Sequence, residues 1–256
     1  MTPDTPLLYE RQGDIAILQL NRPDKRNAIN LPLLDALEEF FSKPPEGIRA
    51  VVLHGGGPHF CAGLDLAERV NSPDKSPIAG MRHSQRWHRT FERIQFGDLP
   101  VVSALKGAVI GGGMELATAT HVRVADASTF FQLPEGKRGV FVGGGGSVRI
   151  GRIIGVGRMV EMMLTARRYD AEDGLRLGLA HYVTEEGRAL EKAIELAREI
   201  AGNAPISNYA IINAIARIND MSMTEGFFTE SVVATLSRAT GEAEQRIHQF
   251  LNSRDS

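Results

Sequence analysis

The sequence predicts an α/β fold in which part of the sheet is parallel. Short apolar runs typical of buried strands alternate with longer stretches whose apolar residues recur at helical spacing, and glycine- or proline-rich breaks separate them. The first strand, helix and strand follow one another as a crossover unit, which pairs its two strands in parallel. At 256 residues the chain can form one large domain, or a domain with an appendage.

The first half of the chain contains the clearest of these elements. We expect, in order, a strand over 15–20, a polar loop over 21–28, a helix from Pro32 to the prolines at 44 and 45, a strand over 49–54, a helix over 76–96 and a strand over 99–105. The loop is either a solvated connection or a site for a phosphate-bearing ligand, with Arg22, Lys25 and Arg26 as candidates. The apolar face around Trp87 is interpreted first as core packing and second as a lid over an apolar substrate.

Two glycine runs interrupt the middle of the chain, and a glutamate lies near each in the sequence. Gly111–Gly113 joins an apolar run to a helical pattern and is followed by Glu115, whereas Glu135 precedes the run at 143–146. Glycine is a poor residue for helix and strand interiors, so the first run is either a tight turn or a junction that brings bare backbone against a ligand. The first amides of a helix that starts there can hold a developing oxyanion. Neither run has the spacing of a nucleotide-binding loop, which disfavours a kinase or dehydrogenase.

In the second half of the chain, strand patterns alternate with helical patterns until about residue 200, and only helical patterns follow. We expect strands over 121–125, 129–132 and 181–183, helices over 150–165, 171–177 and 190–200, and then three helices separated by Pro205, Thr224 and Gly241. The apolar residues of these last helices, such as Ile211, Ile215, Phe227 and Phe228, need partners. A neighbouring subunit would provide them.

Composition and charge exclude several classes of function. The net charge is −2 with both signs interspersed, which argues against polyanion binding as a main function. The single cysteine, Cys61, allows no intrachain disulfide and does not complete a metal site with His54 and His59, so we predict no metal and a reducing compartment. Residues 1–6 have no targeting character, and no apolar run reaches the roughly 18 residues of a membrane helix. We therefore expect a cytoplasmic protein.

Four linked motifs resemble the enoyl-CoA hydratase/isomerase, or crotonase, superfamily. They are Asn21-Arg22-Pro23 with Arg26-Asn27-Ala28, then Phe60-Cys61-Ala62-Gly63-Leu64-Asp65, then Gly107 with Gly111-Gly112-Gly113-Met114-Glu115-Leu116-Ala117, and finally Pro134-Glu135 with Gly139 and the run at 143–146. Their order and spacing match along nearly the whole chain. The resemblance implies a crotonase-like spiral of repeated strand-strand-helix units over residues 1–200. It also implies a C-terminal helical region over 201–256 that makes homotrimers, commonly paired as a hexamer.

The resemblance further implies the substrate and its site. The substrate is an acyl-CoA thioester that brings coenzyme A with it, so no separate cofactor is expected, and neither nucleic acid nor a membrane is a partner. The backbone amides of Leu64 and Gly112 match an oxyanion hole for the thioester carbonyl, where negative charge develops during the reaction. The residues that match the CoA-binding region are Arg26, Asn27, Ala28, Ala62 and Asp65.

Both acidic positions of the hydratases are present, at Glu115 and Glu135. Hydration needs a base that takes a proton from water and an acid that protonates the alpha carbon. The resemblance places Glu115 on the water and Glu135 on the alpha carbon. Isomerases of the family typically lack the first glutamate, so the expected reaction is hydration of the 2,3 double bond of an enoyl-CoA in fatty acid or other acyl-CoA metabolism.

The chain departs from the hydratase pattern at two places near the acyl pocket. Val142 stands where a proline usually precedes the second glycine run, and Gly136-Lys137-Arg138 replaces apolar residues after the glutamate. These changes indicate an unusual acyl group, or an added step such as thioester hydrolysis. A CoA thioester hydrolase, an isomerase, and a non-catalytic member that binds RNA or protein therefore stay open as alternatives.

Overall fold

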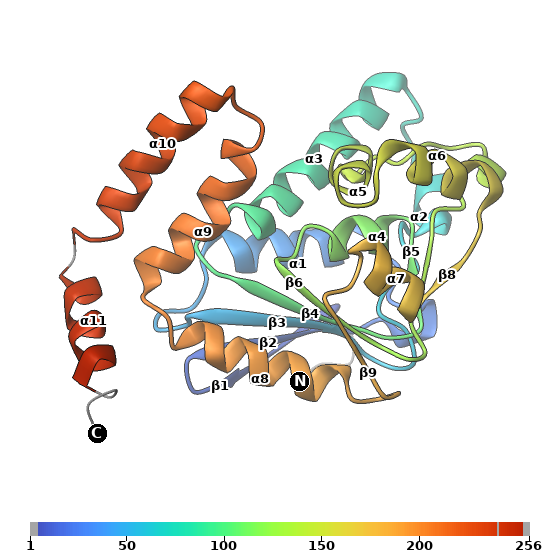
Figure 1. The fold of residues 1–256 in the computed structure, drawn as a ribbon. Helices are drawn as coiled ribbons and strands as arrows, with labels where there is room; N and C mark the ends of the chain where they lie inside the picture. Colours follow the sequence, from blue (N-terminus) through green and yellow to red (C-terminus); the bar gives the residue numbers. More distant parts are fainter. Residues whose placement is uncertain (1–4, 240, 253–256) are drawn as a thin grey trace.

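The main sheet lies between layers of helices (Figure 1) in a computed structural model that describes residues 5–239 and 241–252. Its strands, in spatial order, are β1 (Leu7–Gln12), β2 (Ile15–Leu20), β3 (Ala50–Gly55), β4 (Val101–Leu105), β6 (Val122–Asp126) and β9 (Tyr182–Thr184). Strand β1 is antiparallel to β2, and every other neighbouring pair is parallel. The predicted α/β class is confirmed, as is the parallel pair formed by the first crossover unit, β2 and β3.

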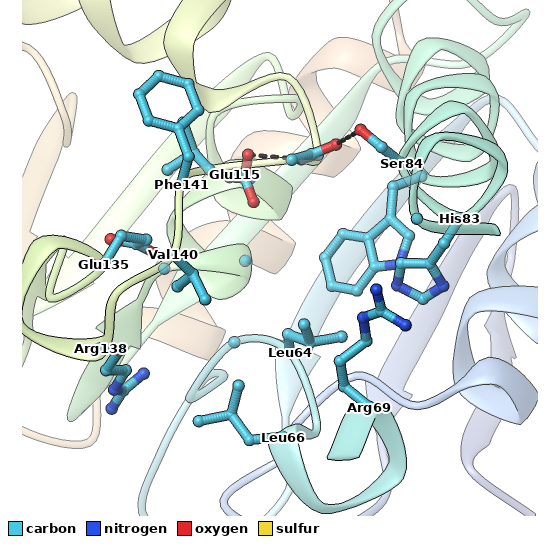
Figure 2. Close-up of a pocket in the computed structure, with 18 of the residues that line it drawn as sticks. Leu64, Leu66, Arg69, His83, Ser84, Glu115, Glu135, Arg138, Val140 and Phe141 are labelled. Carbon is cyan, nitrogen blue, oxygen red and sulfur yellow. Dashed lines mark hydrogen bonds between the residues drawn. The ribbon is translucent and has the colours of Figure 1, made fainter. Parts of the chain in front are cut away.

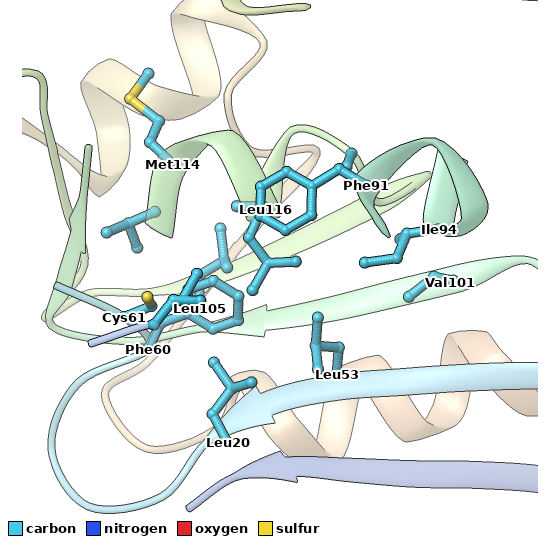
Figure 3. Packing of buried hydrophobic residues seen from close by; sticks show 14 of the residues in the cluster. Leu20, Leu53, Phe60, Cys61, Phe91, Ile94, Val101, Leu105, Met114 and Leu116 are labelled. Carbon is cyan, nitrogen blue, oxygen red and sulfur yellow. The ribbon is translucent and has the colours of Figure 1, made fainter. Parts of the chain in front are cut away.

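The central strands are buried on both faces, and their alternation divides the core in two. Ile15 and Ile17 of β2 pack in the cluster that α8 (Ala189–Ala201) closes on one side of the sheet. Leu18 and Leu20 belong to the cluster on the other side, because successive side chains of a strand point to opposite faces. Helices cover that second face, namely α1 (Leu31–Ser42), α3 (Pro77–Gln95) and α4 (Gly112–Ala117). Figure 3 shows this layer, in which Phe91 of α3 and Leu116 of α4 pack in one cluster with Leu53 of β3.

A smaller sheet positions the first glycine run. Its strands are β5 (Ala108–Ile110), β7 (Phe130–Gln132) and β8 (Tyr169–Asp170), with β5 parallel to β7 and β7 antiparallel to β8. Strand β5 leads through Gly111 directly into α4, as the sequence predicts for a strand-to-helix junction. A bridge between Cys61 and Val109 ties the loop after β3 to the same strand. Two segments about fifty residues apart in the sequence therefore meet at the start of α4.

The remaining helices pack around the two sheets or form the C-terminal end of the chain. They are α2 (Leu66–Val70), α5 (Gly146–Ile154), α6 (Val156–Thr165), α7 (Ala171–Leu177), α9 (Pro205–Ile218), α10 (Met223–Leu236) and α11 (Glu242–Asn252), with 3-10 turns at Pro23–Lys25 and Gly136–Arg138. Helices α10 and α11 stand away from the sheet (Figure 1). They belong to the C-terminal region expected over 201–256, of which residues 240 and 253–256 lie outside the described part. The division into two domains stays a prediction.

Two strands escape prediction from the sequence, and one helical stretch differs. Strand β1 carries polar residues at several of its positions and has an exposed pattern, so it lacks the apolar run that marks the other strands. Strand β8 has only two residues and exists because it pairs with β7. The helical pattern expected over 150–165 begins earlier, at Gly146, and Gly155 divides it into α5 and α6. No helix among the described residues has the length and apolar character needed to cross a membrane. Residues 1–4, which we expected to lack a targeting signal, are outside the described part.

Candidate active site

One cavity of about 310 Å³ brings both predicted glutamates and both glycine runs together (Figure 2). The predicted site residues that line it are Ala62, Leu64, Gly112, Glu115 and Glu135. These five residues come from three segments, namely the loop after β3, the start of α4, and the segment before the Gly136–Arg138 turn. The other predicted residues, at 26–28 and 65, do not line this cavity. They lie on adjoining loops that backbone hydrogen bonds join.

Two unpaired backbone amides lie next to each other at the start of α4. Gly111 adopts a positive φ of 52°, which glycine tolerates without strain, and the helix begins at Gly112. The amides of Leu64 and Gly112 donate no hydrogen bond to any residue that the structure describes. They are close, because a Cβ atom added to Gly112 would lie 3.2 Å from the nitrogen of Leu64. Unpaired N–H donors in a buried site are what a developing oxyanion requires.

Backbone hydrogen bonds hold the loop that carries Leu64 against the predicted CoA-binding loop. The amide of Ala62 donates to the carbonyl of Arg26 at 2.9 Å, and the amide of Asp65 donates to the carbonyl of Ile29 at 2.9 Å. The carboxylate of Asp65 also forms an ion pair of 2.9 Å with Arg22. Residues 26–28 and 62–65, which the resemblance assigns to coenzyme A, therefore form one continuous region.

Two side chains in or next to that region form hydrogen bonds within the protein. Asn27 is fully buried, and its Nδ2 donates to the carbonyls of Gly56 at 2.9 Å and His59 at 2.8 Å. Arg22, which we considered for phosphate contact, pairs instead with Asp65 and donates to the carbonyl of Ala28. Both side chains therefore shape the loop, whereas Lys25 and Arg26 are exposed and keep their positive charges available.

The second glycine run holds the carboxylate of Glu115. This side chain is 3% exposed, and its Oε1 accepts hydrogen bonds from the amides of Gly144 at 2.7 Å and Gly146 at 2.8 Å. Burial raises the pKa of Glu115 above its ordinary value, while these two hydrogen bonds favour the charged form and oppose the shift. Its Oε2 accepts no hydrogen bond from a described residue and can bind a water molecule.

Side chains from α3 and α5 fix the glycine run in turn. Ser84 Oγ donates to the carbonyl of Gly143 (Figure 2), and Arg149 Nη1 donates to the carbonyl of Gly144 at 3.0 Å. With these carbonyls bound to side chains, the amides of the run are directed at Glu115. Ser84 and Arg149 had no signal in the sequence, because each acts on a segment that is remote along the chain.

Glu135 has a different environment in the same cavity. It is 8% exposed, and its Oε2 is buried without a hydrogen-bond partner among the described residues. A Cβ atom on Gly111 would lie 2.6 Å from its Oε1, so the carboxyl packs directly against the first glycine run. Burial raises the pKa of Glu135 to about 7, the charge of Glu115 acts in the same direction, and that of Arg138 opposes them. Near neutral pH this carboxyl is therefore protonated in a large fraction of molecules.

Trp87 belongs both to the core and to the cavity. Its ring packs against Phe91 with 5.4 Å between centroids, as expected for a core residue. It is 4% exposed, and a Cβ atom on Gly112 would lie 2.7 Å from its Cζ3, so its six-membered ring borders the two amides. Cys61 lies nearby but is fully buried, which raises the pKa of its thiol to about 12 and leaves it unreactive.

The chain is similar in sequence to known proteins. A family model described as enoyl-CoA hydratase/isomerase matches residues 10–256. The chain is 31% identical to a 2,3-dehydroadipyl-CoA hydratase of Escherichia coli, over 97% of this chain and 96% of that protein. It is 30% identical to a short-chain-enoyl-CoA hydratase of Clostridium acetobutylicum, over 78% and 77% of the two chains.

Solved structures show the same fold. A Rhodopseudomonas palustris protein provisionally assigned as an enoyl-CoA hydratase superposes with a TM-score of 0.93 at 48% identity, over 99% of this chain and 97% of that one. An enoyl-CoA hydratase of Bacillus anthracis superposes with a TM-score of 0.87 at 29% identity, over 95% and 96%. The expected crotonase-like architecture is thus confirmed for the monomer.

Proposed function

The chain belongs to the enoyl-CoA hydratase/isomerase family, and we propose that within it the protein adds water across the 2,3 double bond of an enoyl-CoA thioester. The observation that carries this proposal is the cavity in which Glu115 and Glu135 share one space with the unpaired amides of Leu64 and Gly112. An isomerase that shuttles a proton with one carboxylate has no need of the first glutamate. The reaction calls for no cofactor beyond the coenzyme A that the substrate carries.

The two amides would receive the oxygen of the thioester carbonyl. As water adds at C3, electrons move onto this oxygen and an enolate-like state forms. Donors that are already in place stabilise this charge without reorganisation, and loss of one such donor in other enzymes costs about 3 kcal/mol. Gly112 also lies at the start of α4, where the unpaired helix amides favour negative charge.

The two carboxyls would divide the proton transfers. Glu115, whose Oε1 accepts hydrogen bonds from the amides of Gly144 and Gly146, binds the water through Oε2 and accepts its proton as the oxygen bonds to C3. Glu135, whose pKa is about 7, gives its proton to C2. One proton then passes from Glu115 to Glu135, directly or through solvent, and restores both groups.

Coenzyme A is proposed to bind along the loops at 26–28 and 62–65. The exposed side chains of Lys25 and Arg26 supply positive charge for its phosphates. Asn27 and Asp65 contribute by holding the loops in place rather than by free side-chain donors.

A homotrimer, or a hexamer of two trimers, is proposed for the assembly. Phe227 and Phe228 of α10 are 64% and 72% exposed, which is costly for side chains of this size. Sedimentation velocity would measure the assembly, and a monomer at micromolar concentration would contradict this proposal.

The proposed reaction is tested by the loss of enoyl thioester absorbance with a short-chain trans-2-enoyl-CoA. Glu115→Gln and Glu135→Gln should each lower kcat/KM by at least about a thousandfold, because each removes a proton-transfer group. Glu46→Gln, in an exposed loop outside the cavity, is the matched control and should behave as wild type. Full activity in both cavity variants would contradict the mechanism. Release of free CoA thiol without a hydrated product would favour a hydrolase, and a shifted double bond would favour an isomerase.

A further inference from the structure

We propose that the acyl group of the natural substrate ends in a carboxylate and that Arg69 binds this carboxylate. The inference rests on the proposed function, since it concerns the far end of the acyl chain that is hydrated. It would make Arg69 a specificity-determining residue outside the four motifs of the family.

One face of α3 forms the wall of the cavity beside the unpaired amides. Gly80, His83, Ser84 and Trp87 line the cavity, and their spacing of three, four and seven residues places them on the same side of the helix. Arg69, at the end of α2, lies against this face, because a Cβ atom on Gly80 would be 3.4 Å from its Nη2. Figure 2 shows its guanidinium beneath the ring of His83.

This wall contains polar side-chain atoms that have no partner among the described residues. Trp87 Nε1 and His83 Nε2 are buried without hydrogen bonds, and Arg69 makes no ion pair or side-chain hydrogen bond with a described residue. Buried polar groups are normally paired, because an unpaired one costs on the order of 1–3 kcal/mol. The two ring nitrogens are buried, whereas Arg69 is only partly buried, so its guanidinium is the group of this wall that a ligand in the cavity can reach.

Two acids, Glu68 and Asp74, lie near Arg69. Glu68 accepts a hydrogen bond from the amide of Leu31 at 2.9 Å, and Asp74 accepts one from the amide of Ser76 at 2.8 Å. Neither carboxylate forms a salt bridge with Arg69. The guanidinium, whose N–H groups match the two oxygens of a carboxylate, favours an anionic acyl end over a neutral one.

The rest of the cavity fits a short apolar stem between the carbonyl and that anion. Leu64 and Leu66 lie between Glu135 and Arg69 in the view of Figure 2, and Val140 and Phe141 line the opposite side. Arg138 also lines the cavity, but it is exposed and lies near Glu135, whose pKa its charge lowers. Arg69 is therefore the cation placed to meet the end of the acyl chain.

A matched pair of substrates tests the inference. We would compare kcat/KM for trans-2-hexenoyl-CoA with that for the analogue whose terminal methyl is a carboxylate. Wild type should prefer the carboxylate, and Arg69→Met should lower kcat/KM for it by about tenfold to a hundredfold, as expected for a charge-assisted hydrogen bond. The same variant should change the methyl substrate by no more than about twofold. Arg82→Met removes a charge from an exposed position of α3 outside the cavity and should leave the preference intact.

Binding of the two saturated thioesters, measured by calorimetry, separates this inference from the hydratase proposal. An Arg69-dependent preference for the carboxylate thioester without any hydration would overturn the proposed reaction and leave the inference standing. If Arg69→Met weakened the binding of both thioesters equally and also weakened the binding of free CoA, Arg69 would bind a CoA phosphate. That result would overturn the inference. An unchanged preference in Arg69→Met would overturn it as well.

Discussion

Each of the two glutamates contacts the glycine run that is farther from it in the sequence, and the two runs give them different environments. Glu115 follows the first run, yet its carboxylate is held by the amides of Gly144 and Gly146 in the second run. Glu135 precedes the second run, yet it packs against Gly111 of the first and receives no hydrogen bond on Oε2. Two donors of the second run thus hold one carboxyl, whereas the other has an oxygen without a partner among the described residues, and burial raises its pKa to about 7. The comparison teaches that two residues of one type acquire different chemistry from the backbone placed beside them.

Among the glycine substitutions, the largest effect is expected from the first glycine run. Gly112→Ala would place a Cβ atom 3.2 Å from the nitrogen of Leu64 and 2.7 Å from Trp87, where the thioester oxygen should bind. We expect kcat/KM for hydration to fall by about a hundredfold to a thousandfold. Gly157→Ala, where a Cβ atom meets nothing within 4 Å, is the control. Wild-type activity in a Gly112→Ala variant with an unchanged circular dichroism spectrum would rule out this role of the first run.

The buried carboxyl of Glu135 should make the free energy of unfolding depend on pH. The folded protein holds this proton more tightly than the unfolded chain, so the free energy of unfolding of the wild type should fall as the pH rises from about 4.5 to about 7. The difference in free energy of unfolding between Glu135→Gln and wild type should therefore rise by about 3 kcal/mol in favour of the variant from pH 4 to pH 8. Urea unfolding at both pH values measures the difference. A gain that does not depend on pH would show that Glu135 titrates normally and that the two carboxyls do not differ.

A smaller effect is expected from the second glycine run. Gly146→Ala would bring a Cβ atom within 2.8 Å of Glu115 Cγ, and the side chain would have to move away from the amides that hold it. We expect roughly a tenfold loss of kcat with little loss of thermal stability, because a flexible side chain can shift at small cost. Gly143→Ala is the matched control, since its Cβ atom would make only an ordinary contact of 3.5 Å with Ser84. Equal activity of the two variants would mean that the second run does not position Glu115.

Most of the fold follows from local sequence pattern, and the two strands that the sequence did not predict depend on pairing with another strand. Strands such as Ile15–Leu20 and helices such as Ala171–Leu177 are predicted to the residue, because buried strands and amphipathic helices carry strong periodic signals. Strand β1 was missed because it is a polar edge strand, and β8 because its two residues are strands only through β7. Pairing partners decide such segments, and a partner leaves no mark on the sequence of a short strand.

The sequence by itself determined which residues could carry chemistry here: two glutamates beside two glycine runs, and the Leu64 and Gly112 positions of the linked motifs. Only the tertiary structure decided what each does. In it Asn27 and Arg22 hold the loops together, Arg69 forms no ion pair with a described residue, and Glu115 accepts two backbone hydrogen bonds whereas Oε2 of Glu135 has no described partner. The physical reason is that burial and hydrogen-bond partners come from segments remote in the chain, and these set a side chain's pKa and its freedom to bind.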